Sequence, residues 1–478
     1  MTDGRLTAPV HGPSVGAMVT ENGTTAARVM WFRRDLRLAD HPALTAAADG
    51  ADVVGLYVLD PRLLAAAGPR ARRLVSSLAA FQEATDGALV IRTGDPEVVV
   101  PQVAAQVGAG QVHISAETRP YGRRRDSRVG QALREAGVAL VATGSPYAVT
   151  PGRVRTASGD PYRVFTPFLR AWREHGWRRP LPPATVRWRR SVESERLPEV
   201  DGLLDRAGGA GEDAALRQWA GFLRGGLRRY GDERDRPDLD STSRLSIPLT
   251  YGEIHPRTLL ADLADRTDLS GPAGSESIDK FVTELAWREF YADALWHRPE
   301  AAWHDYRDQL RAMAYDDDPE AVQAWKAGRT GYPFVDAGMR QLQAENWMHN
   351  RVRMVVASFL VKDLHQWWPV GARHFLDHLL DGDLASNNHG WQWVAGTGTD
   401  AAPYFRVFNP VTQGRKFDPD GQYVRRWIPE LRHLAGPAVH EPWKHLDGYA
   451  HGYPARIVDH AEERRVALDR YAAARGSR

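Results

Sequence analysis

The first third of the chain alternates short apolar runs with longer amphipathic segments. The runs are rich in β-branched and aromatic residues and are bounded by Gly, Asp and Pro, as is typical of buried strands. The segments between them have the length and periodicity of helices. This alternation predicts a doubly wound α/β domain with a parallel sheet over residues 28–150. The predicted strands are 29–32, 53–60, 88–94, 111–117 and 138–144, and the predicted helices are 70–86, 96–108 and 122–136.

The pattern changes after residue 150. Residues 151–214 are rich in Pro, Arg and Gly and are interpreted as an interdomain connection, within which 162–175 has helical character. From 215 to 478 strand signals nearly vanish, so an all-helical second domain is expected. Residues 1–27 are rich in Gly, Thr, Ala and Pro and are expected to be a disordered extension. The predicted helices of the second domain are 213–229, 275–296, 319–327, 335–344, 347–364 and 371–380.

Composition narrows the class of protein. A chain of 478 residues is too long for a single core, and 43% hydrophobic with 26% charged residues fits a soluble globular protein. No apolar stretch is long enough to cross a bilayer and no secretory signal is present, so a cytoplasmic protein is expected. The absence of cysteine excludes disulfides, thiolate nucleophiles and iron–sulfur clusters. The net charge is only +2, so any nucleic-acid site must be a local patch.

Several common chemistries have no motif in the chain. No G-x-G-x-x-G follows the first predicted strand, and neither a P-loop nor a G-x-S-x-G elbow occurs. A dinucleotide fingerprint, an NTPase and a serine hydrolase are therefore not indicated. His374 and His378 have the helical spacing of a metal pair, but they lack a third ligand nearby and a catalytic Glu between them. No metal site is predicted.

Tryptophans are concentrated in the second domain. Eleven of the 16 lie after residue 280. A buried indole needs a partner for its N–H, and an ordinary core prefers Leu, Ile and Val. So many indoles beside polar residues indicate a chromophore, a stacked base or an electron path. The alternative is an aromatic-rich helical core.

One helical face in the second domain is a candidate base-recognition surface. Glu284, Trp287, Arg288 and Tyr291 occur at i, i+3, i+4 and i+7, so they share a face of the predicted helix. A carboxylate beside an indole and a phenol can combine stacking with hydrogen bonding to a base. The alternative is an ordinary surface ion pair between Glu284 and Arg288.

Three further segments supply candidate ligand contacts. In 347–364, Asn350, Arg353 and Met354 share a face, whereas the consecutive Asn350 and Arg351 are expected to point apart, one towards a base and the other towards a phosphate. The hydroxyl-rich turn 242–246 has donors that suit a phosphate. Residues 381–388 are interpreted as a polar turn that leads to two further indoles.

Taken together, these motifs resemble those of the DNA photolyase/cryptochrome family, and are most similar to those of the class I cyclobutane pyrimidine dimer photolyases. The resemblance runs from residue 31 to the end of the chain. It implies an α/β antenna domain, a linker and an all-helical FAD-binding domain, in a monomer that acts on damaged DNA. The matching segments are TSRLS, ELAWREFY, TGYPFVDAGMRQL, WMHNRVRM, DGDLASNNHGWQW and TGTDAAPYFRVFNP.

The implied reaction is light-driven repair of cyclobutane dimers. Excited reduced flavin gives one electron to a flipped-out dimer, the two bonds that join the pyrimidines break, and the electron returns, with no net redox change. A cryptochrome-type light receptor is the alternative from a different class. A (6-4) photoproduct enzyme would require a histidine pair in the pocket, where this chain has Asn350 and Met354, and His349 is expected to point elsewhere.

The resemblance also assigns residues to roles. Asn387 would face N5 of the flavin, Trp287 and Trp393 would wall the dimer pocket, Glu284 would hydrogen-bond the dimer, and the arginines would hold phosphates. The implied FAD contacts are Tyr230, Thr242, Ser243, Arg244, Leu245, Ser246, Phe281, Arg353, Asp381, Gly382, Asp383 and Asn387. The implied DNA contacts are Arg234, Glu284, Trp287, Arg288, Tyr291, Asn350, Arg351, Met354, Trp393, Arg406 and Gln413.

Electron transfer to oxidised flavin would use Trp391, Trp368 and Tyr315 in that order. The outermost position is normally Trp, and Tyr is harder to oxidise unless its proton can leave. Phe281 likewise replaces a Trp of some members, and His389 replaces a common Gly. The segments 32–37 and 120–126 resemble those of deazaflavin-binding members more than those of folate-binding ones, which implies a deazaflavin-type antenna chromophore in preference to methenyltetrahydrofolate.

Overall fold

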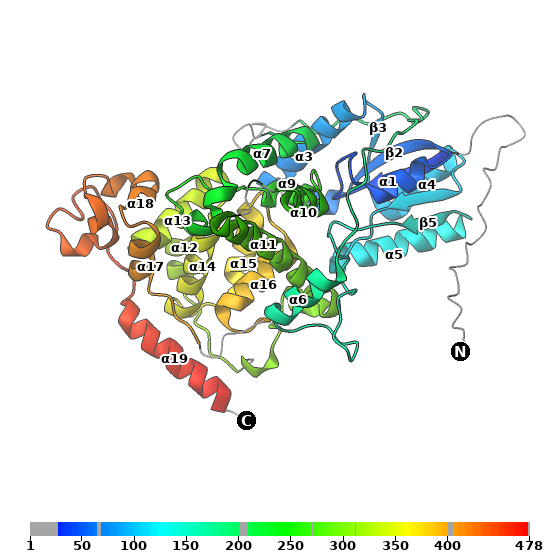
Figure 1. Cartoon of the computed structure of the whole chain (residues 1–478). Helices are drawn as coiled ribbons and strands as arrows, with labels where there is room; N and C mark the ends of the chain where they lie inside the picture. Colours follow the sequence, from blue (N-terminus) through cyan, green and yellow to red (C-terminus); the bar gives the residue numbers. More distant parts are fainter. Residues whose placement is uncertain are drawn as a thin grey trace, which may run out of the picture.

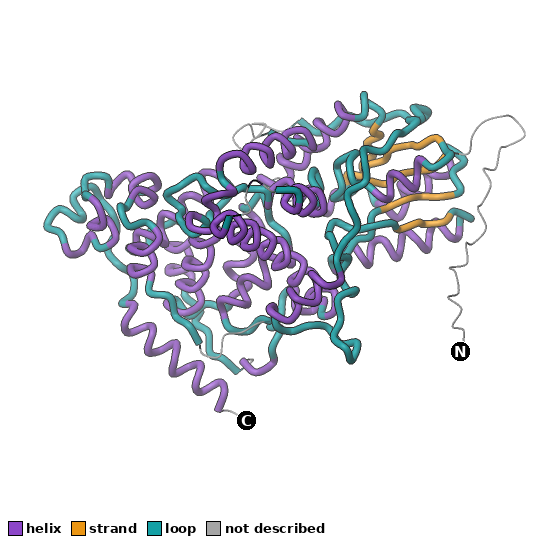
Figure 2. Tube along the Cα trace, viewed as in Figure 1, coloured by secondary structure: helices purple, strands orange, loops and turns teal. Residues whose placement is uncertain are grey.

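A five-stranded parallel sheet forms the centre of the N-terminal region (Figures 1 and 2). In the computed structural model, which describes residues 27–476 except 65–67, 200–208, 267, 269–270, 311 and 400–404, the strand order is β3-β2-β1-β4-β5. Val29 of the central strand is in register with Val54 on one side and Val112 on the other. The strands are β1 (Ala27–Phe32), β2 (Asp52–Leu59), β3 (Leu89–Thr93), β4 (Gln111–Ile114) and β5 (Ala139–Ala142).

Helices cover both faces of this sheet. Leu44 and Phe81, from the first and third helices, share an apolar cluster with Phe32. Val103 and Leu133, from the fourth and fifth, share the opposite cluster with strand residues such as Val29. The predicted doubly wound fold is therefore confirmed, and only the short helices near residues 42 and 61 were not predicted. The helices are α1 (Pro42–Ala48), α2 (Pro61–Leu64), α3 (Pro69–Ala84), α4 (Pro96–Gln106) and α5 (Pro120–Glu135).

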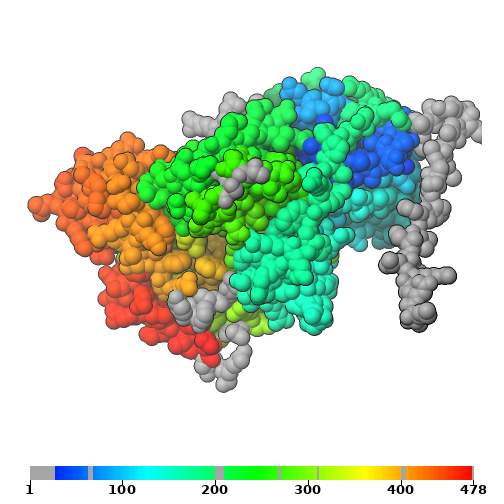
Figure 3. Space-filling view, in the orientation of Figure 1, coloured from blue at the N-terminus to red at the C-terminus, as the bar shows by residue number. Residues whose placement is uncertain are grey.

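The connection between the two regions packs against both of them. It contains α6 (Phe165–His175), at the position expected to be helical. Further along, Trp188 rests on Gly55 of β2, where an added Cβ would lie 3.0 Å from the indole. In Figure 3 the teal part of this connection lies on the surface between the α/β region and the helical region.

The rest of the chain is helical, as predicted. Many of its helices begin with Pro at the first or second position, where the missing N–H has no intrahelical role. Residues 359–363 form a π-helical turn after α14. The helices are α7 (Glu212–Gly225), α8 (Tyr230–Glu233), α9 (Ser246–Tyr251), α10 (Pro256–Ala264), α11 (Pro272–His297), α12 (Pro319–Lys326), α13 (Pro333–Glu345), α14 (Asn350–Ser358), α15 (Trp368–His378), α16 (Leu384–Ala395), α17 (Pro410–Phe417), α18 (Gln422–Trp427) and α19 (His460–Gly476).

One segment was assigned wrongly from the sequence. The stretch 381–388 was expected to be a polar turn, but the helix α16 begins at Leu384. Asp383 caps it by accepting a hydrogen bond from the Ser386 amide at 3.0 Å. Its Asn, His and Gly residues are poor helix formers, so tertiary packing outweighs local propensity here. The expected disordered extension lies outside the described residues apart from Ala27, the first residue of β1.

Buried ion pairs join the α/β region to the helical region. Arg73 of α3 donates two hydrogen bonds to Glu253, at 2.8 and 2.6 Å, and both side chains are almost fully buried. Arg257 of α10 makes a similar two-point contact with Asp40, at 2.9 and 2.8 Å. Such two-point contacts fix the relative orientation of the groups they join.

We expect Arg73→Ala to lower the free energy of unfolding by about 3 to 5 kcal/mol, because it leaves the Glu253 carboxylate buried without its cation. Arg187→Ala is the matched control, since Arg187 pairs with Asp52 while 61% exposed, and it should cost less than about 1 kcal/mol. Urea unfolding of both variants measures the difference. Equal losses would mean that the buried pair contributes no more than a surface pair.

Candidate functional site

A cavity of about 540 Å³ lies inside the helical region. Its volume is in the range of about 300 to 1,000 Å³ that small-molecule sites occupy. The walls come from the turn before α9 and from helices α8, α9, α11, α14, α15 and α16. All twelve residues that the family resemblance assigns to FAD line it, so chain segments far apart in sequence meet at one site.

The turn 242–246 forms one wall. Arg244 has φ +50°, a left-handed conformation that is uncommon for a residue other than Gly. Its guanidinium lies 4.1 Å from the ring centre of Trp347, and its charge is balanced by Glu345 at 3.4 Å. The Gln218 side chain holds the turn from behind by donating to the Ser243 carbonyl at 2.7 Å. The hydroxyls of this wall therefore have a fixed backbone behind them.

Charged groups elsewhere in the cavity lining are paired. Arg353 donates to both carboxylate oxygens of Asp381, at 3.1 and 2.9 Å. Asp383 accepts a hydrogen bond from the guanidinium of Arg34, in the α/β region, at 3.0 Å. Burial alone would raise the pKa of Asp383, but the nearby charges of Arg34, Arg119 and Arg288 outweigh that effect and hold this pKa well below its usual range. Asp383 is consequently an anion at any physiological pH.

Asn387 is held in place on α16 by its amide group. Its Nδ2 donates to the Ala372 carbonyl at 3.1 Å and to the Asn388 side chain at 2.8 Å. The side chain lines the cavity. The amide oxygen therefore remains as an acceptor for a ligand.

Glu284 and Trp287 stand on the α11 wall. Glu284 accepts a hydrogen bond from Arg234 at 2.6 Å, so the alternative of a Glu284–Arg288 pair is wrong. Phe165 stacks on one face of Trp287, with ring centres 3.6 Å apart and an interplanar angle of 8°. Since Trp287 also lines the cavity, its opposite face is the one available for stacking a ligand.

Arg288 and Tyr291 complete this helical face. Arg288 donates to the carbonyls of Pro146 and Leu249, at 3.1 and 3.3 Å, and lies 4.4 Å from the Tyr147 ring centre. These contacts tie α11 to the segments around Pro146 and Leu249, and the DNA contact predicted for Arg288 stays a prediction. Both Arg288 and Tyr291 line the cavity, as the shared-face prediction requires.

The beginning of α14 contributes four predicted residues to the cavity lining. They are Asn350, Arg351, Arg353 and Met354. The different partners expected for Asn350 and Arg351, a base and a phosphate, stay a prediction. Arg351 pairs with Asp235 at 2.8 Å. His349, which caps the helix through its Nδ1, is absent from the described lining, as expected.

Two predicted DNA contacts lie outside the described lining of the cavity. Arg406 is exposed and Gln413 is half-buried on α17. The Arg406 carbonyl accepts a hydrogen bond from the buried Lys362. A position outside the cavity fits the outward, phosphate-binding role predicted for Arg406, which stays a prediction.

The predicted electron relay begins in the cavity and runs into the core. Trp391 lines the cavity and packs on Gly371 of α15, where an added Cβ would lie 2.1 Å from its ring. Gly371 is one helical turn after Trp368, so Trp391 and Trp368 lie on the same side of α15. Trp368 is fully buried and donates from Nε1 to Asp305 at 2.7 Å. Tyr315 packs in a separate cluster with Phe405.

Several lining residues were not identified from the sequence. Trp347 is the first residue of the segment WMHNRVRM, from which other site residues were predicted, so its place in that motif was a signal in the sequence. The apolar members carry no chemical signal and are placed by the fold alone. The unpredicted lining residues are Leu249, Thr250, Leu285, Trp347, Met348, Ala357, Phe375, Leu379, Ser386, Gly390 and Val394.

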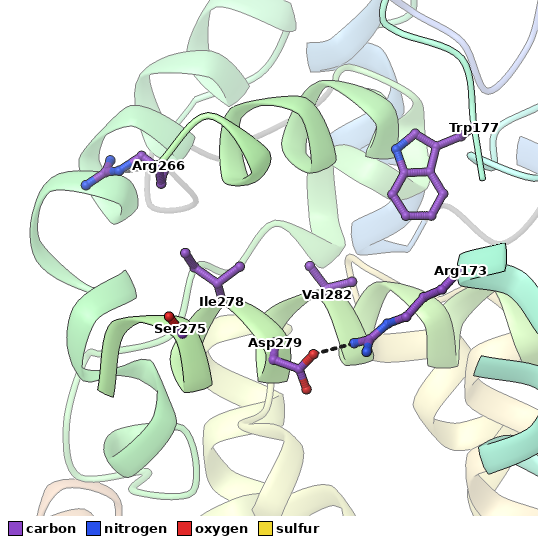
Figure 4. Close-up of a pocket in the computed structure, with 7 residues that line it drawn as sticks. All are labelled: Arg173, Trp177, Arg266, Ser275, Ile278, Asp279 and Val282. Atoms are coloured by element: carbon purple, nitrogen blue, oxygen red, sulfur yellow. Dashed lines mark hydrogen bonds and ion pairs between the residues drawn. The ribbon is translucent and has the colours of Figure 1, made fainter. Parts of the chain in front are cut away.

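A second, shallower pocket of about 380 Å³ lies on the outer side of α11. Figure 4 shows Arg173 turned towards Asp279, and the two side chains form an ion pair at 2.5 Å. The other cation of its lining, Arg266, is paired with Asp268 at 2.6 Å. Its charged groups are thus already satisfied, and none of the predicted site residues borders it.

Metal-binding clusters and membrane-spanning helices are both absent from the described part of the chain. Across the described part of the chain, no three His, Cys, Asp or Glu side chains are grouped so as to hold a metal ion. His374 and His378 are neighbours, with ring centres 4.2 Å apart. None of the helices built from the described residues is long and apolar enough to cross a bilayer.

Comparisons with known proteins match both regions. A DNA photolyase family model matches residues 28–186, and a model of the FAD binding domain of DNA photolyase matches residues 281–473. A deoxyribodipyrimidine photo-lyase of Streptomyces griseus is 44% identical, over 91% of this chain and 97% of its own length. A protein of the same name from Escherichia coli is 39% identical, over 94% of this chain and 98% of its own length.

Solved structures show the same architecture. A bacterial class III photolyase from Agrobacterium tumefaciens superposes with a TM-score of 0.88 at 36% identity, covering 97% of this chain and 100% of that one. A Synechocystis cryptochrome gives a TM-score of 0.85 at 26% identity, over 93% of this chain and 99% of that one. An archaeal photolyase from Sulfolobus tokodaii, whose structure holds two FAD molecules, gives a TM-score of 0.78 at 28% identity. The match covers 94% of this chain and 100% of that one.

Proposed function

Since the chain belongs to the DNA photolyase family, we propose that it repairs cyclobutane pyrimidine dimers in DNA under light, with FAD as its cofactor. The observation that carries the proposal is that one cavity of the helical region collects both sets of residues. The residues implied for FAD and nine of the eleven implied for DNA border this one space. A cofactor and a lesion held there would be neighbours, as one-electron transfer between them requires.

The cavity suits FAD in its chemistry. The turn 242–246 offers hydroxyl donors, and Arg244 offers a cation for phosphates. Asn387 would present its amide oxygen to an N–H of the reduced flavin ring. Gly390 faces open space, because an added Cβ would meet no atom within 4 Å, and it lines the cavity midway between Asn387 and Trp393. A flat ring can therefore lie against the α16 backbone here.

When bound in its reduced form, FAD supplies the light-excited electron on which the reaction depends. The chain's own residues bind and orient the lesion. Trp287 and Trp393 offer the aromatic faces between which a flipped-out dimer would stack. Glu284, held by Arg234, would hydrogen-bond the dimer. Arg351 and Arg406 would hold the phosphates that flank it.

Glu284→Ala is expected to lower the quantum yield of repair several-fold, while the affinity for dimer-containing DNA falls less. The carboxyl group interacts more strongly with the dimer that carries the extra electron than with the ground state. Glu284→Gln keeps the shape and a hydrogen-bonding group and should retain more of the yield. Repair per absorbed photon and DNA affinity are measured for each variant. A loss confined to affinity would make Glu284 a binding residue only.

The proposed function is tested with purified, FAD-loaded, chemically reduced protein and an oligonucleotide that contains one thymine dimer. Blue light should restore the two thymines in single- and double-stranded DNA, and a dark control should leave the dimer intact. If the dimer persists under light while FAD is fully bound, the repair function is wrong. The cryptochrome-type receptor, whose fold is similar, would then be favoured.

For the α/β region we propose an antenna chromophore of the deazaflavin type. The two segments that led to this expectation lie side by side: Arg33 and Asp126 form an ion pair at 3.4 Å, and Arg33 and Arg125 both lie over the Trp31 ring. The absorption spectrum of the purified protein identifies the chromophore. A folate spectrum or that of a second flavin would contradict the deazaflavin assignment.

A further inference from the structure

We propose that Trp367 is the surface exit of the electron path that begins at Trp391, so that light-driven reduction of bound flavin draws electrons through Trp391, Trp368 and Trp367. The inference rests on the proposed function, because it supplies the outer end of the relay that serves the same cavity. It replaces Tyr315, the outermost position that the family resemblance implies.

Trp367 is in contact with the middle relay residue. Trp367 and Trp368 are consecutive, and their ring centres lie 6.4 Å apart at 66°. Among the described residues, Trp367 is the aromatic ring that Trp368 contacts. Trp367 is 36% exposed, whereas Trp368 is fully buried. An oxidised Trp368 thus has a water-accessible indole as its direct neighbour.

Tyr315 is less suited to the same role. It is half-buried and packs against the apolar cluster that contains Leu310, Met313 and Phe405. Burial, and to a lesser degree the charge of Asp305, raises the pKa of Tyr315. Its hydroxyl makes no hydrogen bond to any other part of the described chain. A phenol becomes readily oxidisable only when its proton can leave, so Tyr315 keeps its electron more firmly than a solvated indole does.

Asp305 favours the step that precedes the exit. Its carboxylate accepts the Nε1–H of Trp368 at 2.7 Å. A negative charge beside this buried indole stabilises the positive charge that Trp368 carries after it loses an electron. The positive charge is therefore favoured on Trp368 over Trp391. An electron from Trp367 can then neutralise Trp368 and move the positive charge to the surface.

Each electron that reaches the flavin along this path is finally replaced by one from a dissolved thiol. Trp391 gives one electron to light-excited oxidised flavin, Trp368 refills Trp391, and Trp367 refills Trp368. The oxidised Trp367 releases its indole proton to water, which prevents the electron from returning. A dissolved thiol then gives one hydrogen atom to Trp367 and becomes a thiyl radical, and two thiyl radicals combine to form a disulfide.

The test compares Trp367→Phe with Tyr315→Phe in FAD-loaded protein under blue light with an added thiol. Trp367→Phe should lose sustained flavin reduction and shorten the lifetime of the oxidised-tryptophan signal, and Tyr315→Phe should match the unchanged protein in both. Trp177→Phe is the matched control. Trp177 is also a partly buried indole in contact with a buried one, Trp172, at 4.5 Å, but it borders the outer pocket of Figure 4.

A second readout detects the oxidised residue itself and not the reduced flavin. A nitroso spin trap present during illumination should be found by mass spectrometry on Trp367. An unchanged reduction rate in Trp367→Phe, an equal loss in Tyr315→Phe, or an adduct on Tyr315 alone would overturn the proposal. Normal flavin reduction in Trp368→Phe would instead show that the assumed relay is wrong. Failure of the chemically reduced, unchanged protein to repair dimers would concern the proposed function alone.

Discussion

The Trp391→Phe variant is expected to lose light-driven reduction of oxidised FAD completely while its chemically reduced form repairs dimers at the normal rate. Trp391 is the relay residue that lines the cavity, and it packs on Gly371 one turn from Trp368. Phenylalanine fills most of the same space but cannot be oxidised at these potentials. Repair starts from reduced flavin and does not draw on the relay, so the two activities separate.

Transient absorption and single-turnover repair measure these two activities. Trp325→Phe is the matched control, because Trp325 is also fully buried and its ring centre lies 6.1 Å from that of Trp391, yet it does not border the cavity. It should photoreduce normally. Normal photoreduction in Trp391→Phe, or an equal loss in Trp325→Phe, would mean that the inner electron donor has been assigned wrongly.

Gly390→Leu is expected to abolish FAD binding, and with it both photoreduction and repair. Gly390 lines the cavity, and a side chain added there projects into open space where the ring system is proposed to lie. Leu is a better helix former than Gly by about 0.5 to 1 kcal/mol, so α16 itself should not be weakened. The loss would therefore come from steric exclusion of the cofactor and not from unfolding.

The FAD content of purified protein, measured beside its circular dichroism, tests this expectation. Gly390→Ala should keep most of the FAD because a methyl group occupies little of the cavity. Gly221→Leu is the matched control: Gly221 is an exposed residue in the interior of α7, and its added Cβ also meets no atom within 4 Å. Full FAD occupancy in Gly390→Leu would place the cofactor away from this face of α16.

The architecture could be predicted from the sequence because its signals are local. Five apolar runs separated by helical segments indicate a parallel sheet, and all five strands were located within three residues at either end. The wrong assignment of 384–388 has a different cause. The helix α16 is rich in Asn, His and Gly and is stabilised by the Asp383 cap and by burial of residues such as Trp391. Those are tertiary effects that no local pattern reports.

The site was predicted by motif and not by geometry. Residues such as Arg353, Asp381 and Asn387 were named through the family resemblance, and the fold brings them to one cavity. Individual side-chain contacts could not be predicted from the sequence. The Arg34–Asp383 pair joins residues 349 positions apart, and the Trp367–Trp368 ring contact depends on side-chain directions at the start of α15. Sequence spacing alone cannot show either one.

The central claim is that one cavity holds both the flavin and the flipped-out dimer. The most direct measurement is a crystal structure of the protein with FAD and a duplex that contains one thymine dimer, determined in the dark. The dimer should lie outside the helix between Trp287 and Trp393, with Glu284 at hydrogen-bonding distance and FAD against α16. A dimer that remains stacked in the duplex, or that is bound away from this cavity, would contradict the account.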